Sequence, residues 1–500
     1  MFIDYKASFL RFVYPFLFDS DQFLALCEGV GQARWKGRKG LLQVWEQEDF
    51  PKDDLLAHVA EFLNPPRGVE PTARLWSMST AALQSPNGGF GAGTNSTVSW
   101  ELVTPRGDIL FEISCVQLIF FRIGIGLVNI DAKPIRTQAE VSDWLNFLHY
   151  FRFSCGQRGV SLRARQRVGY DAERQEPSFT PFFPQAPQSS TADTDSSVHL
   201  QDLLQIILDS CTGTSGKWWN DVFVPGQLLP FAVLFPDDAT DGEIPGMLYR
   251  IRNYFHARQT VHPTSNDLSM DHPALLPYAR QQWFTYSLNG GGFVAFNAPK
   301  TDFFRITLPD HLKKTYFLLY LLALKQRFTL IMLSQEVATR WVEQKHSLKD
   351  GGYMENREDA FARIQDHLLF FMARGYYAQV MQTENHHRYY RKWHEIFQME
   401  QLYEEVSDEI RYMHDFLQTQ REKRTQEIEE ANRSRVEKLE RNLSLIAWII
   451  GIPALLLTFL DVVGVDSFQV AVFTFAGGVV LGLLITVTIR LLTKRSESQQ

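Results

Sequence analysis

Two uninterrupted apolar runs lie close together near the end of the chain. Residues 443–460 read LSLIAWIIGIPALLLTFL and residues 470–489 read VAVFTFAGGVVLGLLITVTI. Neither run contains a charged side chain, and each is about the ~20 residues that a helix needs to cross ~30 Å of hydrocarbon. A buried helical hairpin of a soluble protein is the alternative, but soluble helices of this length without one charge are rare. The pattern therefore predicts a two-span transmembrane hairpin over residues 443–490.

Basic residues flank both ends of this hairpin, whereas the connecting loop is acidic. The loop contains Asp461 and Asp466 and no base. The flanking bases are Arg433, Arg435, Lys438 and Arg441 before the first run, and Arg490, Lys494 and Arg495 after the second. The positive-inside rule places such flanks in the cytoplasm. We expect a multi-pass protein of the cell (inner) membrane with both termini cytoplasmic, residues 491–500 forming a basic cytosolic tail.

Small and polar residues recur at spacings of three and four along the first run, which places them on one helix face. They are Ser444, Ala447, Gly451, Ala454, Thr458 and Asp461. Such a face either packs closely against other helices or lines a water-filled lumen. The acid at its end favours the lumen, so these six residues are candidate pore-lining positions, with Gly464 and Asp466 at the outer mouth. Because two helices cannot enclose a pore, conduction requires an oligomer.

The region before the hairpin has the pattern of a long helix. Residues 376–450 contain neither Gly nor Pro, and apolar residues recur every three or four positions. The seam comprises Met399, Leu402, Val406, Ile410, Met413, Leu417, Ile428, Ala431, Leu439 and Leu443. We expect a helical stalk over residues 376–442, with a break near 383–387. Since no linker separates the stalk from the first span, movement of the stalk must move the membrane helix.

Residues 1–375 mix strand and helix patterns and predict a cytosolic α/β or α+β sensor domain. Strands are expected within 109–130, 229–235 and 292–296, and an amphipathic helix over 138–151. Residues 308–337 read as an apolar helix, but Lys325 and Arg327 interrupt it, so we do not expect a third span. The Pro-, Ser- and Thr-rich stretch 171–197 predicts a flexible loop.

Two arginines stand out as candidate ligand-binding residues in this domain. Arg122 sits inside a continuous apolar run, and Arg305 lies just before a helix start. A buried guanidinium needs a partner, either an internal acid or an anionic ligand, and both alternatives stay open. The glycine-rich stretch 87–96 reads as a hairpin loop rather than a phosphate cradle, because a strand pattern follows it. The pair His386 and His387 lacks the regular spacing of metal ligands, and a solvated helix end is the preferred interpretation.

Composition narrows the function class. The net charge of −7 argues against a direct nucleic-acid-binding surface, and the four cysteines form no CxxC pair, as in a reducing cytosol. No recognised signal peptide, nucleophile elbow, zinc-protease or kinase motif is present. We expect a protein that is not an enzyme.

The order of cytosolic domain, long stalk, two C-terminal spans, short outer loop and basic tail resembles the CorA superfamily of divalent-cation channels. The resemblance covers about residues 375–500 and implies a CorA-like funnel, a homopentamer, a pore lined by the first span, and Mg²⁺ or another divalent cation as the permeant ion. No cofactor is indicated otherwise. The family's Gly-Met-Asn tripeptide is absent, and Val463-Gly464-Val465-Asp466 stands in its place. Magnesium selectivity is therefore in doubt.

The strings FFRIGIGLVNIDAKPI and FFRITLPDHLKKTYFLLYLLALKQRF also resemble CorA-like membrane proteins of type III CRISPR systems. That resemblance implies an antiviral effector whose cytosolic domain binds a nucleotide second messenger and which permeabilises the membrane. Arg122 and Arg305 would then be cations for a phosphate-bearing ligand. A non-conducting, membrane-anchored binding protein is the third alternative, with the small-residue face used only for packing.

Overall fold

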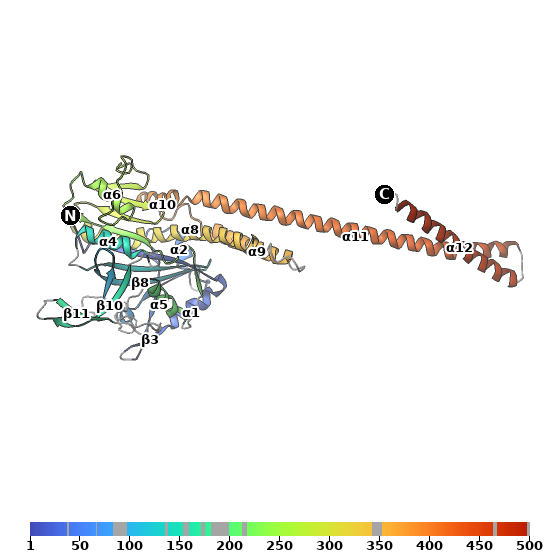
Figure 1. Ribbon diagram of the computed structural model, residues 1–500, viewed down its shortest axis with the longest axis horizontal. Coiled ribbons are helices and arrows are strands. Elements are labelled where there is room, and N and C mark those ends of the chain that lie inside the picture. The colour runs from blue at the N-terminus through green and yellow to red at the C-terminus, as the bar shows by residue number, and fades with distance from the viewer. Residues whose placement is uncertain are drawn as a thin grey trace. The chain divides into compact units, whose positions relative to one another are not determined.

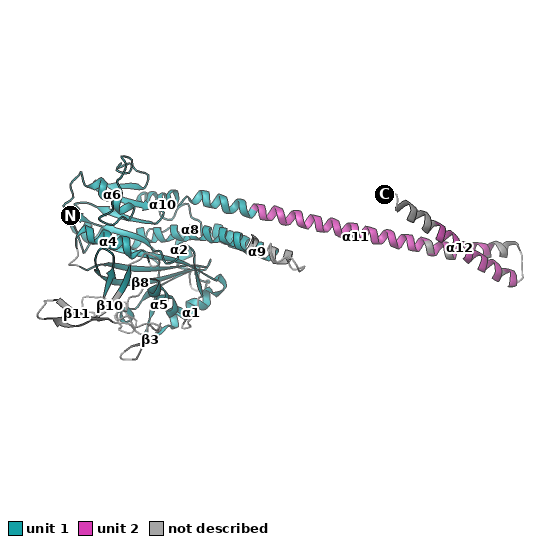
Figure 2. Ribbon diagram, in the orientation of Figure 1, with its two compact units in different colours: residues 1–410 teal, residues 411–500 magenta. Residues whose placement is uncertain are grey.

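The computed structural model describes residues 1–37, 40–66, 68–83, 98–135, 139–153, 160–171, 176–181, 200–212, 218–342, 353–463 and 468–497. They form two compact units, residues 1–410 and residues 411–500 (Figure 2). The first unit combines a large sheet with helices, and the second consists of helices, so the mixed α/β class expected from the sequence is confirmed. The stretch 87–96 and the outer-mouth residues Gly464 and Asp466 lie outside the described residues.

One large, mostly antiparallel sheet forms the centre of the first unit (Figure 1). Its strand order is β11 (Glu176–Pro181), β10 (Ser161–Asp171), β7 (Val98–Val103), β8 (Ile109–Phe121), β9 (Ile125–Pro134), β2 (Phe9–Phe18), β13 (Leu229–Leu234), β17 (Gly290–Ala295), β16 (Gln282–Ser287) and β15 (Leu275–Ala279). Strand β12 (Trp219–Asp221) pairs with β2, while β6 (Ala73–Met78) pairs with β8 and with β5 (Trp45–Glu48). Strands β13 and β17 run parallel.

Smaller elements complete the strands. Strand β1 (Phe2–Ile3) pairs with β14 (Pro236–Asp237), and β3 (Arg34–Gly37) pairs with β4 (Gly40–Gln43). The predicted strands within 109–130, 229–235 and 292–296 correspond to β8 with the start of β9, to β13 and to β17. Within the stretch 171–197, residues 172–175 and 182–197 lie outside the described part, while 176–181 form β11.

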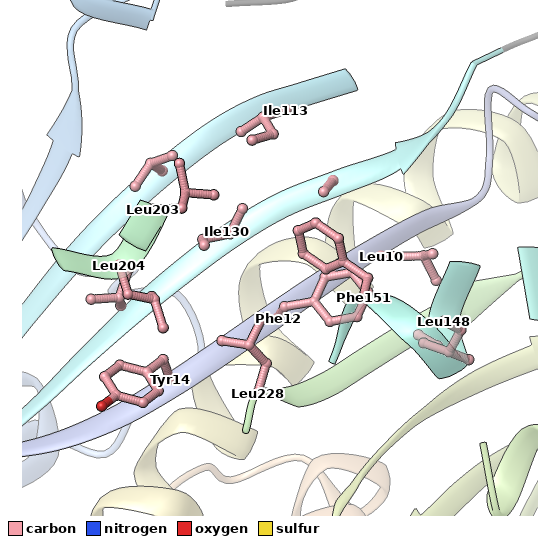
Figure 3. Packing of buried hydrophobic residues seen from close by; sticks show 14 of the residues in the cluster. Leu10, Phe12, Tyr14, Ile113, Ile130, Leu148, Phe151, Leu203, Leu204 and Leu228 are labelled. Carbon is pink, nitrogen blue, oxygen red and sulfur yellow. The ribbon is translucent and has the colours of Figure 1, made fainter. Parts of the chain in front are cut away.

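Strand β2 is buried on both faces and therefore separates two cores. Its even-numbered residues face helix α4 (Val141–Phe151), where the rings of Phe12 and Phe151 lie 4.6 Å apart (Figure 3). Its odd-numbered residues face the opposite way, and the guanidinium of Arg11 lies 4.2 Å from the ring centre of Phe317. The first core also contains buried residues of α1 (Phe23–Gln32), α5 (Leu200–Thr212) and α6 (Ile244–Arg252).

The second core surrounds a long helical segment. It runs through η2 (Phe303–Thr307), α7 (Leu308–His311), η3 (Leu312–Tyr316), α8 (Phe317–Glu336) and η4 (Val337–Val342). This segment is long and apolar enough to cross a membrane, but 89% of its apolar window is buried inside the protein. The sheet covers it on one side, since Phe231 of β13 stacks on Tyr320 at 5.6 Å. The expectation that the helix over 308–337 is not a third span agrees with this burial.

Helices α9 (Tyr353–Arg374) and α10 (Glu384–Ile396) follow, and the predicted break near 383–387 coincides with the start of α10. Trp393 of α10 packs on Tyr320, with ring centres 4.7 Å apart. A Cβ atom at Gly291 would lie 2.6 Å from the Trp393 ring, so the glycine lets α10 approach the sheet. A second break follows α10, because Gln398 adopts a left-handed φ of 53°. The short elements η1 (Ser20–Gln22), α2 (Ala57–Leu63) and α3 (Thr80–Leu83) complete the unit.

Helix α11 (Met399–Val463) begins in the first unit and extends through the second, where α12 (Phe468–Glu497) accompanies it. The seam of the stalk is buried at Val406, Ile410, Met413 and Leu417, whereas Ile428, Leu439 and Leu443 are 60, 61 and 63% exposed. By length and composition α11 is the second helix able to cross a membrane, and only 6% of its apolar window is buried. Helix α12 contains the shorter apolar segment Val472–Thr488.

Lys325 is the most unusual residue of the α8 core. It is 1% exposed, and its Nζ donates to the Gly375 carbonyl at 3.3 Å. The same Nζ lies 5.1 Å from the ring centre of Phe62 and 5.4 Å from that of Phe371. Gln326 Nε2 donates to the same carbonyl at 3.0 Å. No described carboxylate forms an ion pair with Lys325. Burial lowers the pKa of Lys325 from 10.5 to about 7.

This burial predicts a specific pH dependence of stability. Between pH 7 and 10.5 the unfolded chain holds the Lys325 proton more tightly than the folded chain, so stability rises with pH over that interval and is lowest below pH 7. Lys325→Met removes the buried charge while Gln326 still satisfies the Gly375 carbonyl. We expect it to stabilise the protein by about 1–4 kcal/mol at pH 6 and by less at pH 9.

Apparent melting temperatures from tryptophan fluorescence between pH 6 and 9 check this expectation. Lys300→Met, at a lysine that is 63% exposed, is the matched control and should show the wild-type profile. Identical pH profiles for Lys325→Met and wild type would contradict the assignment.

Candidate functional site

A row of polar side chains crosses the sheet on the face toward α8. Ser77, Gln117 and Asn129 stand side by side on β6, β8 and β9. Gln117 Nε2 donates to Ser77 Oγ at 3.3 Å, and Asn129 Nδ2 donates to Gln117 Oε1 at 3.0 Å. Asp131 on β9 then lies opposite Arg11 on β2. The row is polar although the neighbouring strand residues are apolar and buried.

Arg11, Asp131 and Lys313 form a charge cluster at the end of this row, in which Arg11 and Asp131 are buried and the Lys313 side chain is 44% exposed. Arg11 Nε lies 2.8 Å from Asp131 Oδ1, and Lys313 Nζ lies 3.4 Å from Asp131 Oδ2. Arg11 Nη1 also donates to the Lys313 carbonyl at 2.7 Å, which joins strand β2 to η3. Arg11 and Asp131 are 6% and 3% exposed. Charges taken out of water need partners, and here each holds the other in place.

Two pockets lie on either side of this cluster and share Ser114 and Lys313 in their walls. The first, of 610 Å³, has cations from Arg11, Lys313 and Lys314. Its other polar walls come from Glu46, Glu48, Asp49, Asp53, Ser77, Thr80 and Gln117, and its apolar walls from Leu75, Met78, Ile119, Phe317, Leu318 and Leu321. The volume is in the range typical of small-molecule sites, about 300–1,000 Å³.

The second pocket, of 460 Å³, contains Arg305, Lys133 and Lys6 together with Glu112, Asp131 and Asp310. Lys133 Nζ donates to the Tyr5 carbonyl at 3.2 Å and lies over the Tyr5 ring, and burial lowers the pKa of Lys133. With Lys313, four cations face three carboxylates in this second pocket, and this excess suits an anionic group of a ligand. We therefore treat the two pockets together as the candidate ligand site.

Cys115, in the wall of the first pocket, is not a nucleophile at neutral pH. Burial raises the pKa of its thiol to about 12, with the Asp131 carboxylate adding to the shift. The thiolate is the reactive form of cysteine, so this side chain serves as a small apolar wall.

The structure places the two predicted ligand-binding arginines at separate sites. Arg122 lies in the turn between β8 and β9, not inside a buried strand, and its side chain is 39% exposed and paired with Glu70. Arg305 is 46% exposed, lies 3.7 Å from Asp4 and borders the second pocket. The two arginines are near opposite ends of strand β9. Arg122 precedes the first residue of the strand, whereas Asp131 and Lys133, which line the second pocket with Arg305, lie near its last residue. An internal acid, one of the two alternatives, accounts for Arg122.

The predicted pore-lining face of α11 turns away from α12. Gly478 of α12 faces Pro453, whose Cα would lie 3.1 Å from a Cβ at that glycine, which explains the small residue. Gly482 is also buried, so the GxxxG face packs as expected. The pore-lining candidates Ser444, Ala447, Ala454, Thr458 and Asp461 are exposed, and Gly451 has no neighbour within 4 Å of its Cβ position.

The interpretation of the pair His386 and His387 as a solvated helix end is wrong for His386, which is buried. His386 is 7% exposed and packs its ring on Tyr316 at 4.9 Å, and burial lowers the pKa of His386 and brings that of His394 to about 4. Among the described residues no group of three or more His, Cys, Asp or Glu is placed to hold a metal ion.

Sequence inspection missed the polar row and the charge cluster. The available signal was the alternation in Val128-Asn129-Ile130-Asp131, where polar residues fall at every second position of a strand and share one face. Arg11 gave no such signal, because only the register of β2 with β9 shows that it meets Asp131.

Comparison with known proteins adds no relative: no protein-family model, no curated protein and no solved structure matches this chain. The residues of the chain and their arrangement in the structure are therefore the only guide to its function.

Removal of the central carboxylate should expose the energetic role of the cluster. Asp131→Ala leaves Arg11 buried without its counter-ion, so we expect a loss of about 3–5 kcal/mol of stability. The matched control is Asp237→Ala, which breaks the more exposed pair with Lys300 at 3.2 Å and should cost less than about 1 kcal/mol. Chemical denaturation followed by tryptophan fluorescence measures both, and equal losses would refute a special role for Asp131.

Proposed function

We propose that this protein is an oligomeric, CorA-like channel of the cell membrane that passes divalent cations and is gated through its cytosolic unit. The observation that carries the proposal is the face of small and polar residues on α11. That face turns away from α12 and has no partner within the described part of one chain. A surface of this kind in a membrane calls for other helices or for water.

The exposed apolar surface of the second unit supports a membrane location. Leu455 and Ile450 of α11 are 72% and 65% exposed, and Phe473 of α12 is 80% exposed. Soluble monomers seldom expose contiguous apolar surface on this scale. Lipid would cover these side chains, and the helical form satisfies the backbone within the hydrocarbon.

Several copies are needed to enclose a pore, and the resemblance to the CorA superfamily suggests five arranged as a funnel. Rings of Asp461 and Asp466 at the outer end would then concentrate cations, Mg²⁺ or another divalent ion among them. The missing Gly-Met-Asn tripeptide leaves these carboxylates, together with Gly464, as the groups available to select the ion.

Gating from the cytosol has a physical basis in the contacts of α8 and α10. Gln326 accepts a hydrogen bond from Tyr390 at 2.8 Å, and the Arg327 guanidinium lies 4.7 Å from the ring centre of Phe397. The same helical segment supplies Lys313, Phe317 and Leu321 to the ligand site. A ligand that shifts this segment would shift α10, which is joined to α11 by only two residues, Phe397 and Gln398.

A bulky substitution on the small-residue face tests the channel. In liposomes containing the purified protein, Ala454→Trp should lower divalent-cation flux by about tenfold or more, because the indole would obstruct the lumen. Ala476→Trp on α12 is the matched control, since Ala476 is also exposed and should face lipid. Equal flux in both variants would overturn the lumen assignment. Absence of flux in the wild type, whatever ligand is added, would favour the non-conducting anchored protein.

The ligand site favours a second candidate function, an antiviral CRISPR-associated effector that binds a nucleotide second messenger and permeabilises the membrane. The favouring observation is the excess of cations in the second pocket, of 460 Å³, where Lys6, Lys133, Arg305 and Lys313 stand against three carboxylates, next to the first pocket of 610 Å³. Phosphate groups are bound by such charge-assisted hydrogen bonds. Absence of the selectivity tripeptide is compatible with leakage without ion selection.

Nucleotide binding and dye release distinguish the two candidates. We expect ATP or cyclic di-AMP, used as probes, to bind the full-length protein, and Lys313→Ala to weaken that binding by about tenfold. Lys300→Ala serves as the control for an exposed lysine outside the pockets. Probe-dependent release of an encapsulated dye from liposomes would support the effector, whereas strict divalent selectivity would support the channel. Unchanged binding in Lys313→Ala would remove the pocket from either function.

A further inference from the structure

Three side chains from distant parts of the first unit form a hydrogen-bonded chain. Ser20 Oγ lies 3.4 Å from His367 Nε2, and His367 Nδ1 lies 3.2 Å from Glu336 Oε2. Ser20 begins η1, Glu336 ends α8, and His367 lies in α9. The side chains of His367 and Glu336 are 18% and 16% exposed, so the imidazole is mostly buried yet reachable.

This chain opens onto a third pocket, distinct from the two that make up the ligand site. The pocket has a volume of 350 Å³ and contains both Ser20 and His367 in its wall. Its remaining walls are Arg122, Phe23, Leu24, Ile123 and Phe370, with carboxylates from Asp21 and Asp366. A hydroxyl, an imidazole and a guanidinium thus face one small, largely apolar space.

The arrangement of atoms matches the division of roles in serine hydrolases. A carboxylate that accepts from Nδ1–H fixes the imidazole tautomer that leaves the Nε2 lone pair toward the hydroxyl. Such a constellation is recognised by geometry and not by sequence order. The Ser20–His367 distance of 3.4 Å is longer than an ideal hydrogen bond, which is common in catalytic sites without substrate.

We propose that this pocket is an esterase site, in which Ser20 is the nucleophile, His367 is the general base and Glu336 is the positioning residue. The substrate class is a carboxylic ester with a short apolar acyl group, because Phe23, Leu24 and Phe370 would surround such a chain. Arg122, held by Glu70 at the pocket wall, is the cation available to a developing oxyanion.

The reaction runs in two balanced halves with water as the co-reactant. Ser20 Oγ bonds to the ester carbonyl carbon as its proton passes to His367 Nε2. The tetrahedral oxyanion collapses, the carbon–oxygen bond to the alcohol breaks, and the alkoxide takes the proton from His367. Water then attacks the acyl-Ser20 carbonyl, giving its proton to His367, and release of the carboxylic acid returns the proton to Ser20 Oγ. No electrons are transferred to or from another reagent.

Covalent labelling of the full-length protein in detergent tests the nucleophile. With a fluorophosphonate probe, we expect mass spectrometry to find the adduct on the peptide that contains Ser20 and to find none in Ser20→Ala. With p-nitrophenyl butyrate, Ser20→Ala should lower kcat/KM by about 100-fold or more. Ser142→Ala is the matched control, because Ser142 Oγ donates to the Glu140 carboxylate at 3.1 Å and has no histidine partner.

A second variant separates catalysis from a purely structural contact. Glu336→Gln keeps the side-chain size, and we expect it to lower kcat by about tenfold or more at nearly constant KM, since it removes the charge that orients His367. Labelling and hydrolysis that persist in Ser20→Ala would overturn the proposal. So would a Glu336→Gln variant whose melting temperature falls while its kcat and KM stay unchanged.

Discussion

Enclosure of α8 is the constraint on which the first unit depends. This helix is apolar around its whole circumference, so it cannot lie on a surface with one face in water. The sheet meets one side of it through Phe231 and Arg11, and α10 meets another through Trp393. Strand β2 must then be buried on both faces, because it separates α8 from the core beneath α4. The two cores follow from that requirement.

Several polar groups that are buried around α8 have specific partners, either beside the ligand site or at the end of α9. Asp131 neutralises Arg11 at the ligand site, and the Gly375 carbonyl receives both Lys325 and Gln326 at the end of α9. A buried charge is costly unless it is paired or loses its proton. Arg11 is paired with Asp131, whereas burial lowers the pKa of Lys325 and so favours its neutral form. Such groups give the core directional contacts that apolar packing alone does not provide.

Helices α8 and α11 pass the same length and composition test for a membrane span and have opposite surroundings. The apolar window of α8 is 89% buried, whereas that of α11 is 6% buried. Lys325, Gln326 and Arg327 within α8 find carbonyl, hydroxyl and aromatic partners in the protein. The first apolar run, residues 443–460, contains no charge that needs such partners. Proposals about ion flux therefore concern α11 and α12 alone.

Local pattern in the sequence was sufficient for the mixed strand and helix composition, for the charge-free hairpin and for the helix break near residue 384. These depend on periodicity, on missing charges and on spacing within a few residues, all of which the sequence displays directly. The expectation that Arg122 is a buried guanidinium was wrong, because an apolar run in the sequence does not show where the chain turns. In the structure the chain reverses at Arg122, Ile123 and Gly124, and the Arg122 side chain is 39% exposed.

Long-range register, by contrast, was decided only by the tertiary structure. Arg11 and Asp131 are brought together by strand pairing, and Ser20, Glu336 and His367 by the packing of α8 and α9 near the first helices. The physical reason is that Arg11 and Asp131, and likewise Ser20 and His367, lie more than a hundred positions apart in the sequence. Glu336 and His367 are closer in sequence, but they belong to two helices whose packing depends on burial of the whole core. The order of residues in the sequence does not show which distant residues meet in space.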